Sequence, residues 1–310
     1  MTTTTARHEA PEERVESPAT ARYVHDLARL HGSLRYGGLE DAILGAPLAR
    51  IDGLGDGLTT LSFWEWQLPE RYMLAVLGFR LAQFLQTGLM DREVAHRLAL
   101  FHEPLPAPAK GVGTVHTVTL TGDGRIVGYL GLVGSPDPEP LPLDSPVRLG
   151  LPVEVAHRVD LLSEYAAPDR TTHNAFEIKR FVRDHQLPRG EQRNRVPWHL
   201  MLACLKVGVA LDDIQVIVGD AGERGALRHL RLVGFDLKVV EGTTPWLPRS
   251  ELMWISYELP VEKRAKPFAA LVPANLPELA AMLETMVAGG GAGWRQAVVS
   301  SLGGPARMRG

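Results

Sequence analysis

Two short apolar segments separated by a helical segment place the strongest constraint on the fold of this chain. Residues 176–184 and 215–219 have the Phe, Ile and Val content of buried strands, and Pro197 starts a helical segment that runs to residue 211. A tight hairpin cannot join two strands that lie on either side of a helix, so such strands pair in parallel. The sequence therefore predicts 176–181 and 215–219 as adjacent parallel strands.

The composition limits the classes of protein that this chain can belong to. A chain of 310 residues with 45% hydrophobic content can form one large core or two modest ones. The formal net charge is only −3 and the Lys and Arg residues are scattered, which argues against a nucleic-acid or membrane-surface protein. The single cysteine, Cys204, excludes an internal disulfide framework and a Cys-rich zinc site. We expect a cytoplasmic protein without a bound metal.

The periodicity of apolar residues predicts helices and strands along most of the chain. Helical spacing predicts helices at 70–87, 91–101, 153–164, 223–233 and 276–288, with shorter helices between 21 and 51. Asp123-Gly124 between two β-branched runs predicts a hairpin of 115–120 with 126–133, and further strands are expected at 237–241 and 252–259. This order predicts an α/β fold with a mixed sheet and helices on its faces.

We expect four regions along the chain. Residues 1–20 lack an apolar segment and are predicted to be a disordered tail. Residues 21–68 are predicted to be an N-terminal helical extension and 69–260 the main domain. Residues 261–310 are predicted to form a C-terminal helical extension and tail.

The first strand of the parallel pair carries two charged side chains, Glu177 and Arg180. Glu177 could act as a general base, and Arg180 could bind an anionic group or pair with Glu177. Residues three apart point to opposite faces of a regular strand, so both reach one site only if the strand contains a bulge. Asp220, just past the second strand, is a second candidate base.

Three short motifs stand out along the chain: Arg80-x-x-x-Phe84, the run Glu-Ile-Lys-Arg-Phe at 177–181, and Gly234-Phe235. Together they resemble the Gcn5-related N-acyltransferase (GNAT) superfamily, most closely its acyl-homoserine lactone synthases and long-chain N-acyl amino acid synthases. The run 177–181 matches the Glu-x-Ser-Arg-Phe of the lactone synthases except at Lys179, and Arg80 with Phe84 matches their early Arg-x-x-x-Phe element. The chain departs from the common acyl-CoA pattern at 192–197, which lacks its glycines, and the Asp-x-x-Asp pair of the lactone synthases is absent.

The resemblance implies an N-acyltransferase with a GNAT-like fold. Its donor would be an acyl-carrier-protein or acyl-CoA thioester, its acceptor an amino acid, peptide or other natural-product amine, and no acyl-enzyme would form. The two parallel strands would diverge and admit the thioester, with its phosphates at the N-terminus of the helix that follows. The residues implied are Glu177, Arg180 and Asp220 for catalysis; Phe181, Val182, Arg189, Arg193, Arg195 and Trp198 for the donor; and Arg80, Phe84, Trp64 and Trp66 for the substrate.

Three alternatives remain open from the sequence. One is a true acyl-homoserine-lactone-type synthase. Another is a GNAT-fold protein without catalysis that binds partners in a biosynthetic assembly, because Leu230 stands where many acetyltransferases of the superfamily keep a Tyr. At single positions, Trp64 and Trp66 could be core residues, and Glu177 with Arg180 could be a surface ion pair.

Overall fold

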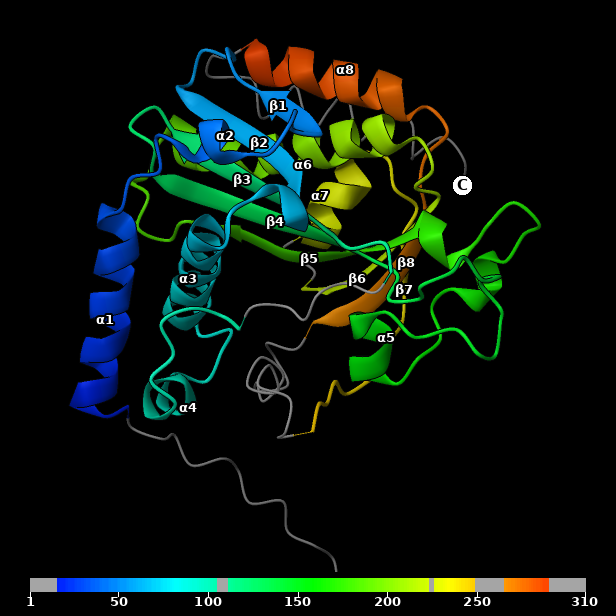
Figure 1. Ribbon diagram of the computed structural model, residues 1–310, viewed down its shortest axis with the longest axis horizontal. Coiled ribbons are helices and arrows are strands. Elements are labelled where there is room, and N and C mark those ends of the chain that lie inside the picture. Colours follow the sequence, from blue (N-terminus) through cyan, green and yellow to red (C-terminus); the bar gives the residue numbers. More distant parts are fainter. Residues whose placement is uncertain (1–15, 105–110, 223–225, 249–264, 290–310) are drawn as a thin grey trace, which may run out of the picture.

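A computed structural model describes residues 16–104, 111–222, 226–248 and 265–289 of the chain, and it forms an α/β structure around one mixed sheet (Figure 1). The helices are α1 (Pro18–Ser33), α2 (Leu39–Ala42), α3 (Glu70–Thr87), α4 (Arg92–Arg97), α5 (Pro152–His157), α6 (Glu191–Leu211), α7 (Ala226–Leu232) and α8 (Leu276–Ala288). The strands are β1 (Ala49–Ile51), β2 (Leu58–Trp64), β3 (Thr114–Thr121), β4 (Ile126–Gly134), β5 (Ala175–Arg183), β6 (Val216–Ala221), β7 (Lys238–Val239) and β8 (Lys266–Leu271).

The sheet has the strand order β1-β2-β3-β4-β5-β6-β8-β7, and its pairs are antiparallel except for β5 with β6. The predicted mixed α/β sheet, the hairpin of β3 with β4 and the parallel pairing of β5 with β6 are therefore confirmed. The helix predicted at 70–87 is α3, and Gly88 caps its C-terminus. Gly88 has φ 66°, a left-handed conformation that a glycine adopts without the steric cost that a side chain would bring.

The structure corrects the expected extent of the sheet at both ends. Residues 21–68 were predicted to be a helical extension, but they contain β1 and β2, which pair with each other and with β3. Residues 261–310 were also predicted to be helical, but β8 lies there and pairs with β6 and β7. The run Lys266–Leu271 is too short and apolar for its periodicity to separate a buried strand from a helix. The strand expected at 252–259 lies outside the described residues.

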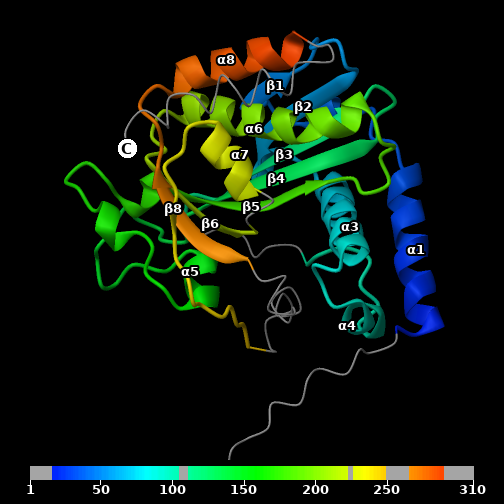
Figure 2. The same ribbon diagram turned by 180° about the vertical axis from the view of Figure 1, so that it is seen from behind.

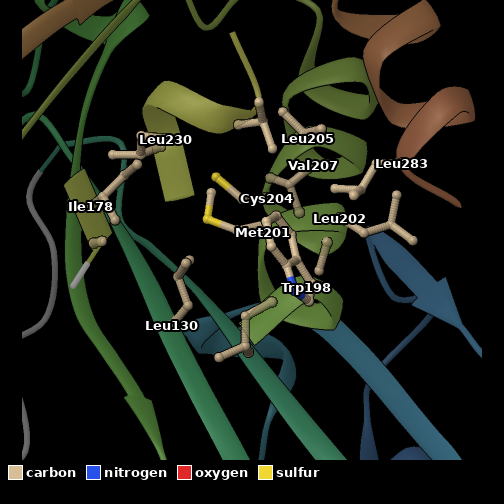
Figure 3. Close-up of a cluster of buried hydrophobic side chains, with 14 of the residues drawn as sticks. Leu130, Ile178, Trp198, Met201, Leu202, Cys204, Leu205, Val207, Leu230 and Leu283 are labelled. Carbon is tan, nitrogen blue, oxygen red and sulfur yellow. The ribbon is translucent and has the colours of Figure 1, made fainter. Parts of the chain in front are cut away.

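The helices cover the two faces of the sheet separately. Helix α6 packs along one face against β1 to β5 and is covered in turn by α8, whereas α3 and α5 lie on the opposite face (Figures 1 and 2). Figure 3 shows the core under α6, where Leu130 and Ile178 of the sheet meet Met201 and Cys204 of the helix. Burial raises the pKa of the Cys204 thiol to about 12, so this cysteine is an inert core residue.

No helix in the described part of the chain combines the length and the hydropathy that a membrane span requires. Among the same residues, His, Cys, Asp and Glu side chains do not gather into a group that could hold a metal ion.

Candidate active site

The parallel strands β5 and β6 pair over only the first part of their length and then diverge. Their paired residues run from Ala175 with Val216 to Ile178 with Gly219. Beyond that point β5 continues to Arg183 beside β4, while β6 continues to Ala221 beside β8. The last shared pair needs a glycine, because a Cβ on Gly219 would lie 2.8 Å from the Ile178 carbonyl oxygen. The predicted divergence of the two strands is thus confirmed.

A bulge in β5 lies where the strands diverge. Tyr129 of β4 pairs with Val182 and Gly131 pairs with Lys179, so two residues of β5, Arg180 and Phe181, stand opposite one residue of β4. Arg180 has φ 60°, a left-handed conformation that is costly for a residue with a side chain and that often marks functional sites. The bulge that the sequence required is therefore present.

The bulge brings Glu177 and Arg180 to the same face of the sheet. Glu177 accepts a hydrogen bond from the Val153 backbone of α5 (2.9 Å), and the Arg180 guanidinium stacks on Phe84 of α3, with Cζ 5.0 Å from the ring centroid. Both helices lie on this face. Phe181 points to the other face, where it contacts the ring of His229 in α7 (centroids 5.3 Å apart).

Six charged residues form a half-enclosed group on this face, which we call the charge cluster. Its members are Arg80, Glu103, Glu177, Lys179, Arg180 and Asp220, and their side chains are between 0% and 18% exposed. Three cations balance three carboxylates, which is what a buried set of charges requires. The cluster joins α3, β5 and β6, so only the tertiary fold assembles it.

Glu103 connects the two arginines that the resemblance implied. Arg80 binds its carboxylate through two hydrogen bonds (2.7 and 3.1 Å), and Arg180 Nε lies 3.4 Å from Oε2. Burial alone would raise the pKa of Glu103, but the charges of Arg80 and Arg180 lower it below its ordinary value. Glu103 was not predicted as a site residue, because it stands just before Pro104 and belongs to no motif.

The contact predicted between Glu177 and Arg180 is replaced by two others. Arg180 turns to Glu103, and Lys179 Nζ lies 3.1 Å from Oε1 of Glu177. Oε1 nevertheless has no hydrogen-bond partner of suitable geometry, whereas Oε2 is held by Val153. Burial raises the pKa of Glu177; the charge of Lys179 opposes this rise and that of Asp220 adds to it.

Asp220 has the opposite character. Its side chain is 18% exposed, and its Oδ2 lies 3.4 Å from His157 Nε2. Burial alone would raise the pKa of Asp220, but the hydrogen bond with His157 and the charges of Lys179 and Arg180 lower it. The two candidate bases therefore differ, because the pKa of Glu177 is raised whereas that of Asp220 is lowered. His157 and Lys179 were missed from the sequence because neither fits a motif.

Two further buried side chains, Tyr129 and His116, extend the polar contacts of Arg80. Arg80 Nη1 lies 3.3 Å from the hydroxyl of Tyr129, and this hydroxyl lies 2.8 Å from His116 Nδ1. Burial and the charge of Arg80 lower the pKa of His116 to about 3, so its imidazole is neutral. Tyr129 can then accept from Arg80 and donate to His116, which fixes the guanidinium.

The helix that was expected to begin near Trp198 begins earlier. Helix α6 starts at Glu191 with Gly190 as its N-cap, and Pro197 lies within its second turn. Arg193 and Arg195 are therefore helical residues, which corrects the expectation that the helix starts only at Pro197. Pro197 was expected to start the helix because Pro is favoured in first turns, but one helical turn precedes it.

The residues expected at the donor phosphates are distributed over different surroundings. Arg189 is exposed at the helix N-terminus, and Arg193 donates a hydrogen bond to the Leu187 carbonyl (2.9 Å). Arg195 is only 4% exposed; its Nη1 donates to the Leu54 carbonyl (3.1 Å) and lies 3.4 Å from Asp56. It connects α6 to the turn before β2, and its burial there leaves little of its surface open to a donor phosphate.

The remaining predicted residues fall into separate groups. Trp198 packs edge-on to His229 (centroids 5.0 Å apart), and Val182 is partly buried against the cores around α3. Trp64 is partly buried at the end of β2, whereas Trp66 is 69% exposed, which excludes a core role for Trp66. Leu230, which stands where many acetyltransferases of the superfamily keep a Tyr, is fully buried in the core.

No protein-family model and no curated protein matches this chain. Solved structures do resemble it. They include the CoA-dependent acyl-homoserine lactone synthase BjaI with MTA (16% identity, covering 73% of this chain and 87% of that one, TM-score 0.41). A second is TofI with an inhibitor and MTA (13%, 72% and 96%, TM-score 0.38). A third is a GNAT-family acetyltransferase from Staphylococcus aureus Mu50 (9%, 69% and 99%, TM-score 0.35).

The fold of the chain is GNAT-like. This follows from the mixed sheet of the described residues, in which the parallel strands β5 and β6 diverge after four residue pairs and are joined by a helix. The structures named above share 9–16% identity with this chain at TM-scores of 0.35–0.41, so no activity or substrate is taken from them.

Proposed function

We propose that this protein is an N-acyltransferase that moves an acyl group from a phosphopantetheine thioester to an amine that also carries a carboxylate. The observation that carries the proposal is the bulge at Arg180, which places a buried base and a guanidinium on one face where the parallel strands diverge. The divergence leaves backbone N–H and C=O groups of β5 without partners on β6, and these suit an amide-containing pantetheine arm.

Glu177 would act as the general base. Its Oε1 lacks a hydrogen bond, and its raised pKa suits a group that must accept a proton from an ammonium near neutral pH. Because the side chain is fully buried, the proton would reach it directly from a bound acceptor or through one water. The amine would then attack the thioester carbonyl, the thiolate would leave, and no protein residue would be acylated.

Arg180 would bind the carboxylate of the acceptor. It is 16% exposed, its Nε has no hydrogen bond, and the single carboxylate of Glu103 is shared between Arg180 and Arg80. A guanidinium with donors to spare is suited to a second carboxylate. This supports an amino acid, or a peptide with a free C-terminus, as the acceptor class.

The phosphates of the donor would lie at the first turn of α6, where unpaired backbone N–H groups and the helix dipole favour anions. Arg189 is exposed beside this turn and Arg193 stands within it. Both acyl-CoA and acyl carrier protein present such a phosphate, so the donor is proposed by this shared chemistry.

The test is a matched pair of acceptors with acyl-CoA donors of several chain lengths. We expect free thiol and an N-acyl product, detected by mass spectrometry, for amino acids such as phenylalanine, and a much lower kcat/KM for phenethylamine, which lacks the carboxylate. The Glu177→Gln variant sets the background. Thiol release no faster than this background for any donor and acceptor would instead favour a GNAT-fold protein that binds without catalysis.

An acyl-homoserine-lactone-type synthase is a second candidate, favoured by one observation. Arg80 and Phe84, from the early motif, reach the same cluster as Arg180 from the later motif. S-Adenosylmethionine as acceptor separates the two candidates, because the lactone-forming reaction releases 5′-methylthioadenosine and simple N-acylation does not.

A further inference from the structure

The short helix α5 contacts both candidate bases at once. The N–H of Val153 donates to Oε2 of Glu177 (2.9 Å), and Nε2 of His157 lies 3.4 Å from Oδ2 of Asp220. These two residues of α5 are four apart and so share one face of the helix. The segment between β4 and β5, in which a helix was expected at 153–164, therefore supplies a shorter helix that packs on the site.

Contacts on several sides fix α5 in this position. Glu154 forms two hydrogen bonds with Arg148 (both 2.8 Å) and accepts two more from the backbone of Leu151 and Leu161. The N–H of Trp246 donates to the carbonyl of Ala156 (2.8 Å). The helix is thus held independently of the two carboxylates that it contacts.

The imidazole of His157 is held at both nitrogens. Nδ1 lies 2.8 Å from the hydroxyl of Thr243, and Nε2 faces Asp220. The side chain is fully buried, so the ring cannot turn away from the carboxylate into solvent. Because Thr243 lies beyond β7, far along the chain, this arrangement is a product of the tertiary fold.

Glu177 and Asp220 lie diagonally across the parallel pair. Glu177 is in register with Val218, and Asp220 follows two residues later on the same face of β6. The charged groups around Glu177 are Lys179 and Asp220, and those around Asp220 are His157, Lys179, Arg180 and Glu177. Two neighbouring carboxylates take up protons one after the other, and their surroundings decide which is first.

We propose that His157 is a positioning residue that holds Asp220 as a carboxylate beside Glu177, so that the first proton taken up by the pair goes to Glu177. Asp220 is then not a base but a fixed negative charge that strengthens the base. This inference rests on the proposed function, in which Glu177 receives the proton of the attacking amine. The opposite directions of the two pKa shifts agree with it.

The experiment follows protonation of the two side chains by infrared titration of the carboxyl C=O bands, with Glu177→Gln and Asp220→Asn to assign them. In the unmodified protein we expect the Glu177 band to appear at higher pH than the Asp220 band. In His157→Leu the order should reverse, by a shift of about one pH unit or more in the Asp220 band. His157→Gln, whose amide can still donate to Asp220, should keep the original order.

Two further variants make the result decisive. His173→Gln is the control, because His173 lies in the same segment but bonds to the Asp137 carbonyl (2.9 Å) instead of a site carboxylate; it should leave both bands unchanged. Thr243→Val removes one restraint on the ring and should shift the Asp220 band in the same direction by less, which serves if His157→Leu does not fold. An unchanged order of the Glu177 and Asp220 bands in His157→Leu would overturn the proposal. So would an Asp220 band that does not shift in Thr243→Val.

The readout is protonation and not turnover, so it separates the two ideas. A protein that releases no thiol with any acceptor would contradict the proposed function, while the titration would still decide the role of His157. If the protein is active, His157→Leu should also lower kcat with little change in the KM for the donor, and His157→Gln should restore most of it.

Discussion

Lys179 Nζ lies 3.1 Å from Oε1 of Glu177, two residues away on the same strand and the same face of the sheet. The bulge begins only after Lys179, so the two side chains keep the regular alternation of a strand. Lys179 is also the position at which the sequence departs from the small hydroxyl residue of the family motif. The substitution thus introduces a cation directly beside the proposed base.

The charge of Lys179 should set the pH at which Glu177 can act. Because this charge lowers the pKa of Glu177, Lys179→Met should raise it and move the acidic limb of kcat/KM to higher pH by about one unit. Lys179→Arg keeps the charge and is the matched control. A pH profile identical in Lys179→Met and the unmodified enzyme would show that another group controls this limb.

Removal of the base should affect catalysis more than binding. Glu177→Gln keeps the size and the hydrogen bond from Val153 but loses basicity, so kcat should fall by about 10²–10⁴ with donor KM nearly unchanged. Asp220→Asn should remain active, with its acidic limb at lower pH, because the charge of Asp220 raises the pKa of Glu177. Full activity of Glu177→Gln beside an inactive Asp220→Asn would make Asp220 the base.

Glu103 should be essential for the stability of the charge cluster. Its side chain is 3% exposed and is the counter-charge of both Arg80 and Arg180, so Glu103→Gln should cost about 3–5 kcal/mol in the free energy of unfolding, measured in urea. The double variant Arg80→Met/Glu103→Leu removes one unpaired charge and should recover part of this loss. A single variant as stable as the unmodified protein would show that water or other groups already screen the cluster.

Acid should destabilise the fold through buried histidines. Burial lowers the pKa of His31 to about 4 and that of His116 to about 3, below the ordinary 6.5 of the unfolded chain. Each of these histidines binds a proton more readily in the unfolded chain than in the folded one, so stability falls as the pH drops from about 6.5 towards 4. At pH 5 each histidine should lower the free energy of unfolding by about 2 kcal/mol.

Urea unfolding of His31→Gln at pH 7 and pH 5 tests this expectation. The loss of stability between these two pH values should be smaller by about 2 kcal/mol in the variant than in the unmodified protein. The control is His25→Gln, because the His25 side chain is 72% exposed, and it should not change the loss. Equal losses in His31→Gln and the unmodified protein would show that His31 is not neutral in the fold at pH 5.

The three arginines near the start of α6 should separate into two kinds. The double variant Arg189→Ala/Arg193→Ala should raise the donor KM several-fold, with the effect shrinking as salt rises, because it removes charge beside the proposed phosphate site. Arg195→Ala should instead lower the stability, since Arg195 is buried against Leu54 and Asp56. A donor KM unchanged in the double variant would exclude this turn as the phosphate site.

The sequence by itself determined the parallel strand pair, the hairpin of β3 with β4, helices α3 and α8, and the need for a bulge between Glu177 and Arg180. These features depend on local periodicity, on turn residues and on the number of residues between two side chains, all of which are written in the chain order. It did not reveal β8, whose six residues show no alternation because the strand is buried in the sheet interior between β6 and β7.

Only the tertiary structure decided the partners of the site residues. Glu103, His157 and Thr243 come from three distant segments: Glu103 belongs to the charge cluster, His157 contacts Asp220 of the cluster, and Thr243 contacts His157. Packing between distant elements also places Arg195, which was expected at the donor phosphates, in a buried contact with the Leu54 carbonyl. Sequence periodicity specifies which face a residue occupies, but the charges that surround it, and hence its pKa, depend on elements that only the folded chain brings together.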